Sequence, residues 1–130
     1  MKPAVLLATV VLFSPGLVAA QDAVKAAQDA VKVDPKHYKA EFENDQVRVV
    51  RVTYAPGEKS PMHSHPNHVF IFLSDGHTRF TLPGGRTLDG AAEAGNVGWA
   101  STDLTHAPEN IGDKPLELIL VEIKPRALRN

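Results

Sequence analysis

Short segments rich in β-branched and aromatic residues, each ended by turn residues, run through most of this chain. Val47–Tyr54 ends at Ala55-Pro56-Gly57, and Val69–Leu73 ends at Ser74-Asp75-Gly76. This composition, bounded by Gly, Pro, Asp and Ser, is typical of β-strands. About eight short strands with no long helical pattern between them predict an all-β barrel or sandwich. The remaining strands are expected at Thr78–Leu82, Arg86–Leu88, Val97–Ala100, His106–Asn110 and Leu116–Ile123, the first two forming a hairpin through Pro83-Gly84-Gly85.

Composition and charge restrict the domain organisation and the partners. The chain has 130 residues, 43% hydrophobic and 22% charged, which fits one globular domain. The formal net charge is -1 and the basic residues are scattered, so the sequence has no basic patch of the kind that binds nucleic acid or anionic lipid. The expected partner is therefore a small-molecule ligand or substrate.

The first residues have the pattern of a secretory signal peptide. Lys2 precedes an apolar run from Ala4 to Phe13, and Val18-Ala19-Ala20 provides small residues for cleavage before Gln21. Because the run is shorter than a membrane-spanning helix needs, an uncleaved anchor is the less favoured alternative. We expect residues 1–20 to be removed on export, leaving a periplasmic or secreted protein without a membrane segment.

A short helical leader is expected at residues 21–36, ahead of a barrel domain at 37–130. The segment Asp-Ala-Val-Lys occurs twice in the leader and places Val24 and Val31 on one helical face. Asp34-Pro35 then ends the helix. Two repeats are too few for a coiled coil, and we assign the leader no chemistry.

Two histidines separated by one residue, His63 and His65, are the strongest functional signal. On a β-strand such residues project from the same face, so their imidazoles reach one point. A third histidine, His106, lies in a distant predicted strand and completes a set of neutral nitrogen donors. Such a set suits one divalent transition metal (Fe, Cu, Mn, Ni or Zn) and leaves coordination positions open for substrate. Because the chain has no cysteine, thiolate ligands are excluded.

Two alternatives to this three-histidine site stay open. In the first, the rings are packing residues of a barrel without metal, although their mutual repulsion at acidic pH makes that arrangement costly. In the second, His68 is a further ligand. On an ideal strand residues 63, 65 and 69 share a face that residue 68 does not, but Pro66 marks a point where a bulge would change the phase.

The first histidine pair lies in a motif that resembles one of the cupin superfamily. The family motif reads Gly, five residues, His-x-His, three or four residues, Glu, six residues, Gly. This chain has Gly57, His63-Ser64-His65, Val69 and Gly76 in those places. The resemblance implies a small antiparallel barrel, the double-stranded β-helix or jelly roll, with a metal held between two such motifs. It also implies that the family's glutamate ligand is replaced by Val69, a side chain that binds no metal.

The second family motif ends in His, three residues, Asn, and is matched by His106 and Asn110. The resemblance covers the chain from Val47 to Ile123 and extends to small single-domain bacterial cupins, some of which are named for β-alanine degradation. Cupins commonly pair, so it also implies a homodimer. A set of three histidines without a carboxylate is similar to the iron site of thiol dioxygenases and some other cupin oxygenases.

Residues close to the histidines in sequence are candidates to orient the rings. Asn110 and Glu58 are the two that we assign to this role, because ligating histidines commonly donate their second ring N–H to a neighbouring polar group. The remaining histidines, His37 and His77, are expected at the surface.

Arg51 and Arg79 are candidates to bind a substrate carboxylate, because guanidinium groups bind carboxylates through two hydrogen bonds. The alternative is that both lie on solvated outer faces of strands. The sequence contains no nucleophile elbow, zinc-protease helix, phosphate-binding loop or dinucleotide fingerprint, which excludes the corresponding hydrolase and nucleotide-binding classes.

Three functions follow from a three-histidine barrel, and the sequence leaves open whether it is an enzyme. The leading one is a metal-dependent oxygenase that acts on a small organic molecule. The alternative is a non-catalytic module that binds a small ligand or a metal. The third is a metal-dependent isomerase or decarboxylase, which needs no dioxygen.

Overall fold

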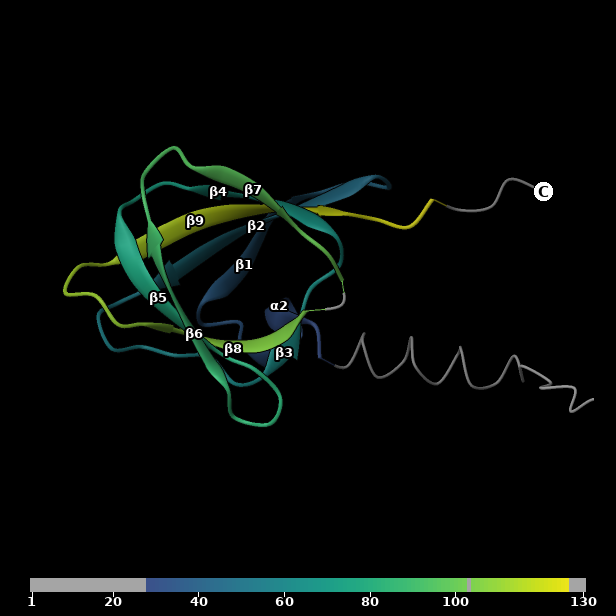
Figure 1. Cartoon of the computed structure of the whole chain (residues 1–130). Coiled ribbons are helices and arrows are strands. Elements are labelled where there is room, and N and C mark those ends of the chain that lie inside the picture. Colours follow the sequence, from purple (N-terminus) through teal and green to yellow (C-terminus); the bar gives the residue numbers. More distant parts are fainter. Residues whose placement is uncertain (1–27, 103, 127–130) are drawn as a thin grey trace, which may run out of the picture.

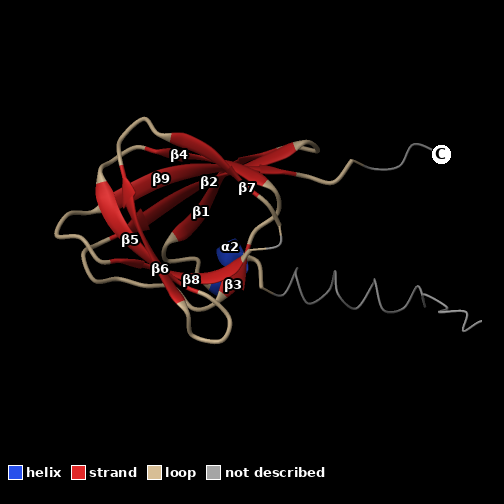
Figure 2. Cartoon of the chain, in the orientation of Figure 1, coloured by secondary structure: helices blue, strands red, loops and turns tan. Residues whose placement is uncertain are grey.

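The computed structural model describes residues 28–102 and 104–126 as two antiparallel β-sheets that face each other, with one short helix, α2 (Ala30–Val33) (Figures 1 and 2). The five-stranded sheet has the order β1 (Tyr38–Glu43), β2 (Val47–Tyr54), β9 (Leu116–Ile123), β4 (His68–Phe72) and β7 (Val97–Ala100). The four-stranded sheet has the order β3 (His63–Ser64), β8 (Thr105–Asn110), β5 (Gly76–Thr81) and β6 (Thr87–Ala92). The predicted all-β barrel is confirmed.

The strand predictions agree with these bounds to different degrees. β2, β7 and β9 begin and end where the sequence predicts, and the expected hairpin is the pair β5–β6. The sequence pattern did not identify β1 or β3. The predicted signal peptide and residues 21–27 of the predicted leader lie outside the described residues, and the described part of the leader contains α2, which ends before Asp34-Pro35 as predicted. Within the described residues, none of the helices has the length and apolar character needed to cross a bilayer.

The core lies between the sheets and is built from alternate residues of β2 and β9. Val50 pairs with Leu120, and Tyr54 pairs with Leu116, and all four side chains are buried. Paired residues in an antiparallel sheet share a face, so each pair contributes two apolar side chains to the same interior. Burial of this apolar face fixes which residues of each strand point inward.

One side of the barrel is closed and the other is not. The helix α2 contacts both β1 and β3, which are the edge strands on one side, and an isolated bridge joins Asp29 to Ser64 there. On the other side the edge strands are β6 and β7, and the pairings of the described residues do not join them. The interior is therefore sealed beside α2 and has its opening between β6 and β7.

Candidate functional site

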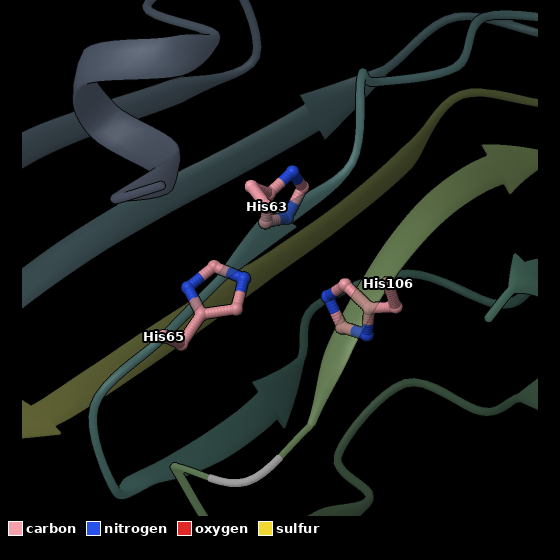
Figure 3. A group of neighbouring side chains, drawn as sticks. All are labelled: His63, His65 and His106. Atoms are coloured by element: carbon pink, nitrogen blue, oxygen red, sulfur yellow. The ribbon is translucent and has the colours of Figure 1, made fainter. Parts of the chain in front are cut away.

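The three predicted ligands come together at the closed side of the barrel (Figure 3). His63, His65 and His106 are all buried, and one ring nitrogen of each lies within 4.8 Å of those of the other two. Strand pairing explains the convergence, because β3 pairs with β8 so that His63 lies opposite His106. His65 follows β3 directly and completes the group. The group meets the requirement for a metal site in number, type and proximity of donor atoms.

Hydrogen bonds fix which nitrogen of two rings faces the group. Nδ1 of His63 donates to the carbonyl oxygen of Pro61 at 2.9 Å, since a carbonyl only accepts. Nδ1 of His65 lies 3.4 Å from Oε1 of Glu122, an acceptor as well. A neutral imidazole that donates from Nδ1 keeps a lone pair on Nε2, which is the form that binds metal. Both rings are therefore held in the ligating tautomer.

Three buried ring nitrogens have no hydrogen-bond partner among the described residues: Nε2 of His63 and both nitrogens of His106. A buried polar atom without a partner costs about 1–3 kcal/mol, and such atoms are rare in folded proteins. A metal ion bound by the lone pairs of His63 Nε2 and of one His106 nitrogen would satisfy two of these three atoms. The donor set, three neutral imidazoles, is one that transition metals accept. The residues present therefore fit a bound metal.

Burial keeps the imidazoles of His63 and His106 uncharged at neutral pH. Burial, together with the neighbouring His65, lowers the pKa of His63 to about 4. Burial, together with the neighbouring rings of His65, His63 and His68, lowers the pKa of His106 to about 3. A protonated histidine binds no metal, so the depressed pKa values keep the donors in the state that a metal needs.

A buried carboxylate from β9, Glu122, anchors the cluster. Its second oxygen accepts a 2.5 Å hydrogen bond from Nε of Arg48, whose other two nitrogens bind the two oxygens of Asp29 at 2.8 and 2.9 Å. Burial would raise the pKa of Glu122, but the hydrogen bonds from His65 and Arg48 outweigh burial and lower it. A carboxylate bound to the distal nitrogen of a ligating histidine orients the ring and makes it a stronger donor. Glu122 has this position relative to His65.

The structure places His68 on the inner face of β4, beside the cluster. His68 and Phe70 line the interior, whereas Val69 between them does not. The ideal-strand phase, which would put Val69 on the face of His65, does not apply because β3 and β4 belong to different sheets, and the alternative of a changed phase after Pro66 agrees with the structure. The His68 ring centroid is 5.1 Å from that of His65, and its Nδ1 donates to the carbonyl of Pro66 at 2.8 Å. Its role as a ligand stays a prediction.

Asn110 and Glu58, the two residues predicted to orient the rings, make their hydrogen bonds elsewhere. The buried side chain of Asn110 binds the backbone of Tyr54, Gly112 and Lys114, so it holds the chain after β8. Glu58 binds Lys36, His37 and the backbone N–H of Ala55. Neither contacts the cluster through these bonds, and the sequence prediction is corrected to Glu122.

A buried polar network, which the sequence did not reveal, lies next to the cluster. The Tyr38 ring packs against His63 at a centroid distance of 4.8 Å, and its hydroxyl is 2.8 Å from that of Tyr54. The predicted surface position of His37 is wrong, because the ring is buried, stacked on Tyr54 at 4.4 Å. His77 is exposed, as expected. The network continues from Tyr54 through Ser60 and Asp34 to His37 and Glu58.

Arg51 and Arg79 lie away from the interior, which corrects their assignment as substrate anchors. Arg51 pairs with Glu41 and Glu117, and Arg79 pairs with Asp89. Neither arginine lines the cavity. Both occupy outer faces of their strands, where carboxylates of the chain itself satisfy them.

The sequence carries a signal for Glu122 that lies outside the two histidine motifs. In β9, Leu116, Leu118 and Leu120 alternate with outward residues and all line the interior. Glu122 continues this inward series, whereas Glu117 belongs to the other face. A charged residue at an apolar position of a strand predicts a buried, partnered group.

The comparisons with known proteins agree with this architecture. The profile of the Cupin_2 family, described as "Cupin domain", matches residues 50–122, and no curated protein matches the chain. A cupin domain from Bordetella pertussis Tohama I is 20% identical, with a TM-score of 0.64 over 68% of this chain and 92% of that one. A Klebsiella pneumoniae protein with a double-stranded β-helix domain is 21% identical, with a TM-score of 0.54 over 69% and 78%.

A third structure, a cupin 2 conserved barrel domain protein from Salinispora arenicola CNS-205, is 19% identical, with a TM-score of 0.53 over 68% of this chain and 76% of that one. At these sequence identities, structural similarity establishes the fold but does not indicate the activity. The family profile covers more than half of the chain, including both histidine segments. The chain therefore belongs to the cupin superfamily, as a Cupin_2 domain with a buried three-histidine cluster.

Proposed function

We propose that this cupin is a metal-dependent oxygenase that acts on a small organic molecule. One divalent transition metal would be held by His63, His65 and His106, with iron or copper favoured for oxygen chemistry because both are redox-active. The observation that carries the proposal is the convergence of three buried imidazoles, two of which, His63 and His106, have ring nitrogens without a hydrogen-bond partner among the described residues.

The chain's own residues would prepare the site. A bound metal would supply open positions for substrate and dioxygen, acting as Lewis acid and redox centre. Pro61 and Glu122 hold His63 and His65 in the ligating tautomer. Phe80 stacks on His106 at a centroid distance of 5.1 Å and limits its rotation. These contacts hold the donor atoms in position before a metal binds. Metal binding would therefore lose less side-chain conformational entropy.

Oxygen consumption tests the proposal. Iron- and copper-reconstituted protein and metal-free protein would be supplied with thiol, diketone and phenolic substrates in an oxygen electrode. We expect uptake with one substrate class that depends on metal and is lost in His106→Ala. His77→Ala is the matched control, since that histidine is exposed, and should keep the activity. Uptake that never exceeds the metal-free control would contradict the proposal.

The second candidate is a non-catalytic module that binds a small ligand or metal. One observation favours it: among the described residues, the cavity lining contains no Asp, Glu, Lys or Arg that would act as a general base. A ligand recovered unchanged after long aerobic incubation with metal-loaded protein would support this function. Turnover under anaerobic conditions would instead indicate an isomerase or decarboxylase.

A further inference from the structure

The cavity between the sheets has a mostly apolar wall. Its volume is about 650 Å³, within the range typical of small-molecule sites, and His65, His68 and His106 form part of its wall. Much of the remaining wall consists of the apolar side chains Val52, Phe70, Phe72, Phe80, Leu118 and Leu120. Two of the three candidate metal ligands, His65 and His106, therefore share one cavity with a hydrophobic surface large enough for an organic molecule.

Small residues on the two open edge strands create this space. Gly90 of β6 pairs with Thr78, and Ala100 of β7 pairs with His68. Because paired residues share a face, and both partners line the cavity, these small residues face inward too. The exposed members of the lining are Gly90, Ala91, Asn96, Val97, Trp99 and Leu104. Five of them lie on β6, on β7 or directly before β7, and Leu104 directly precedes β8, so the entrance lies between β6 and β7.

The wall offers no counter-ion to a charged ligand. Among the described residues that line the cavity, none is Asp, Glu, Lys or Arg. The hydroxyl groups of Tyr38 and Tyr54 are bonded to each other, and the charged side chains of Arg48 and Glu122, which bind each other beside the histidines, are not part of the wall. Burying an ionised group without a partner is far more costly than burying an apolar one. A carboxylate or ammonium group in this wall would have no compensation from the protein.

We propose that the cavity takes an uncharged, largely apolar molecule that carries an aromatic ring and a single oxygen donor atom. The ring packs among Phe70, Phe72 and Phe80, where edge and face contacts between aromatic groups are favourable. The donor atom points toward the histidines, and this part of the inference rests on the proposed function. Binding of the apolar body depends on the wall alone and needs no metal.

Isothermal titration calorimetry with two matched probes tests the inference. The probes are 2-naphthol, neutral at pH 7, and 2-naphthoate, which differs mainly by its negative charge. Both are titrated into the mature protein after chelator treatment, once circular dichroism has shown that it stays folded. We expect 2-naphthol to bind at least about tenfold more tightly than 2-naphthoate, because the cavity leaves the carboxylate unpaired. Equal or tighter binding of 2-naphthoate, or no binding of 2-naphthol, would overturn the inference.

Two variants show where the probe binds. Gly90→Val adds a side chain at the entrance, where a Cβ meets only the Thr78 hydroxyl at 3.5 Å, and should weaken 2-naphthol binding at least about tenfold. Arg79→Ala removes an outer-face charge and should leave both affinities unchanged. The proposed location would be overturned if Gly90→Val bound 2-naphthol as tightly as the wild type. It would also be overturned if Arg79→Ala lost binding of 2-naphthoate. A dimer in the absence of probe that Gly90→Val disrupts would assign the entrance to a second copy instead.

Adding Zn²⁺ to the same samples separates this inference from the proposed function. Stronger 2-naphthol binding after metal addition supports a donor atom directed at the histidines. A protein that binds 2-naphthol but no metal would refute the metal-dependent function and leave the apolar site intact. A protein that binds metal but not 2-naphthol would refute the apolar site and leave the metal-dependent function intact.

Discussion

Glu122 gives this chain a carboxylate beside the histidines even though Val69 occupies the family's glutamate position. Asp29, Arg48 and Glu122 form one connected group with two negative charges and one positive charge. The remaining negative charge lies next to His65, where it would partly balance a divalent cation held by neutral imidazoles. The three candidate ligands carry no negative charge themselves, and Glu122, which is hydrogen-bonded to His65, would supply one beside them.

Replacing Glu122 by glutamine should therefore weaken metal binding. The amide retains the size of the side chain but removes the charge that polarises His65, and we expect a loss of about 10- to 100-fold in affinity. Competition with a chromophoric chelator measures it. Glu117→Gln is the matched control, since Glu117 lies on the same strand but pairs with Arg51 outside. Equal losses in the two variants would contradict a specific role for Glu122.

The metal-free protein should lose stability as the pH falls from about 6.5 to 4. Unfolded histidines take up protons near their ordinary pKa of 6.5, whereas the folded values are about 4 for His63 and about 3 for His106. The unfolded chain binds more protons in this window, so stability declines with acidification and this contribution levels off below about pH 3. Thermal unfolding from pH 7.5 to 4 measures the slope. His106→Gln should reduce it and His77→Gln should not; an unchanged slope in His106→Gln would count against the burial argument.

At the scale of single strands, the sequence predicted those whose pattern is strong and missed those whose pattern is weak. β2 and β9 are long and rich in β-branched or aliphatic residues, and their bounds were predicted correctly. β3 has only two residues, too few for any periodicity. β1 is mostly exposed, and its register shifts between Ala40 and Phe42, which breaks the alternation on which the prediction depends.

The same distinction applies to the site. Spacing and family motif were sufficient to predict His63, His65 and His106, because the ligand positions are encoded locally. The partner of His65 is 57 residues away in sequence, on a strand whose position beside β4 only the folded structure reveals. Arg51 and Arg79 were misassigned because residue type alone does not show that carboxylates of the same chain already bind them.

Gly98 on β7 should be intolerant of a side chain. It pairs with Phe70, and a Cβ at this position would lie 2.2 Å from the Phe70 ring. Gly98→Ala must displace a ring that lines the cavity, and we expect a loss of about 1–3 kcal/mol in unfolding free energy. Urea denaturation measures it against Gly90→Ala, where a Cβ finds ordinary contact at 3.5 Å. Equal stabilities of the two variants would show that Phe70 does not occupy the space over Gly98.

At the scale of the whole molecule, the two sides of the barrel differ in structure: one is closed by α2 and the other is open between β6 and β7. Helix α2 contacts β1 and β3 on the side that holds the histidines (Figure 1), and Asp29 at its start binds Arg48. The opposite side, between β6 and β7, presents small and exposed residues at the cavity. The buried histidine cluster thus lies on the side of the barrel away from the entrance, a position that would shield a bound metal from bulk water.

We further propose that the chain is exported, on the signal-peptide pattern of residues 1–20. Expression in a bacterial host followed by cell fractionation should recover the protein in the periplasm or medium with Gln21 as its first residue, as mass spectrometry would show. Replacing Leu6 and Leu7 by arginine interrupts the apolar run and should retain the protein in the cytoplasm. Wild-type protein found in the cytoplasm with its first twenty residues intact would contradict export.

Elemental analysis of the mature protein, purified without chelator and then reconstituted with each candidate metal, shows whether His63, His65 and His106 bind a metal. We expect about one equivalent of a transition metal in the wild type and in His77→Ala, and none in a folded His63→Ala, His106→Ala double variant. Folded wild-type protein that retains no metal after reconstitution, or a double variant that retains as much as the wild type, would contradict a metal site at these histidines.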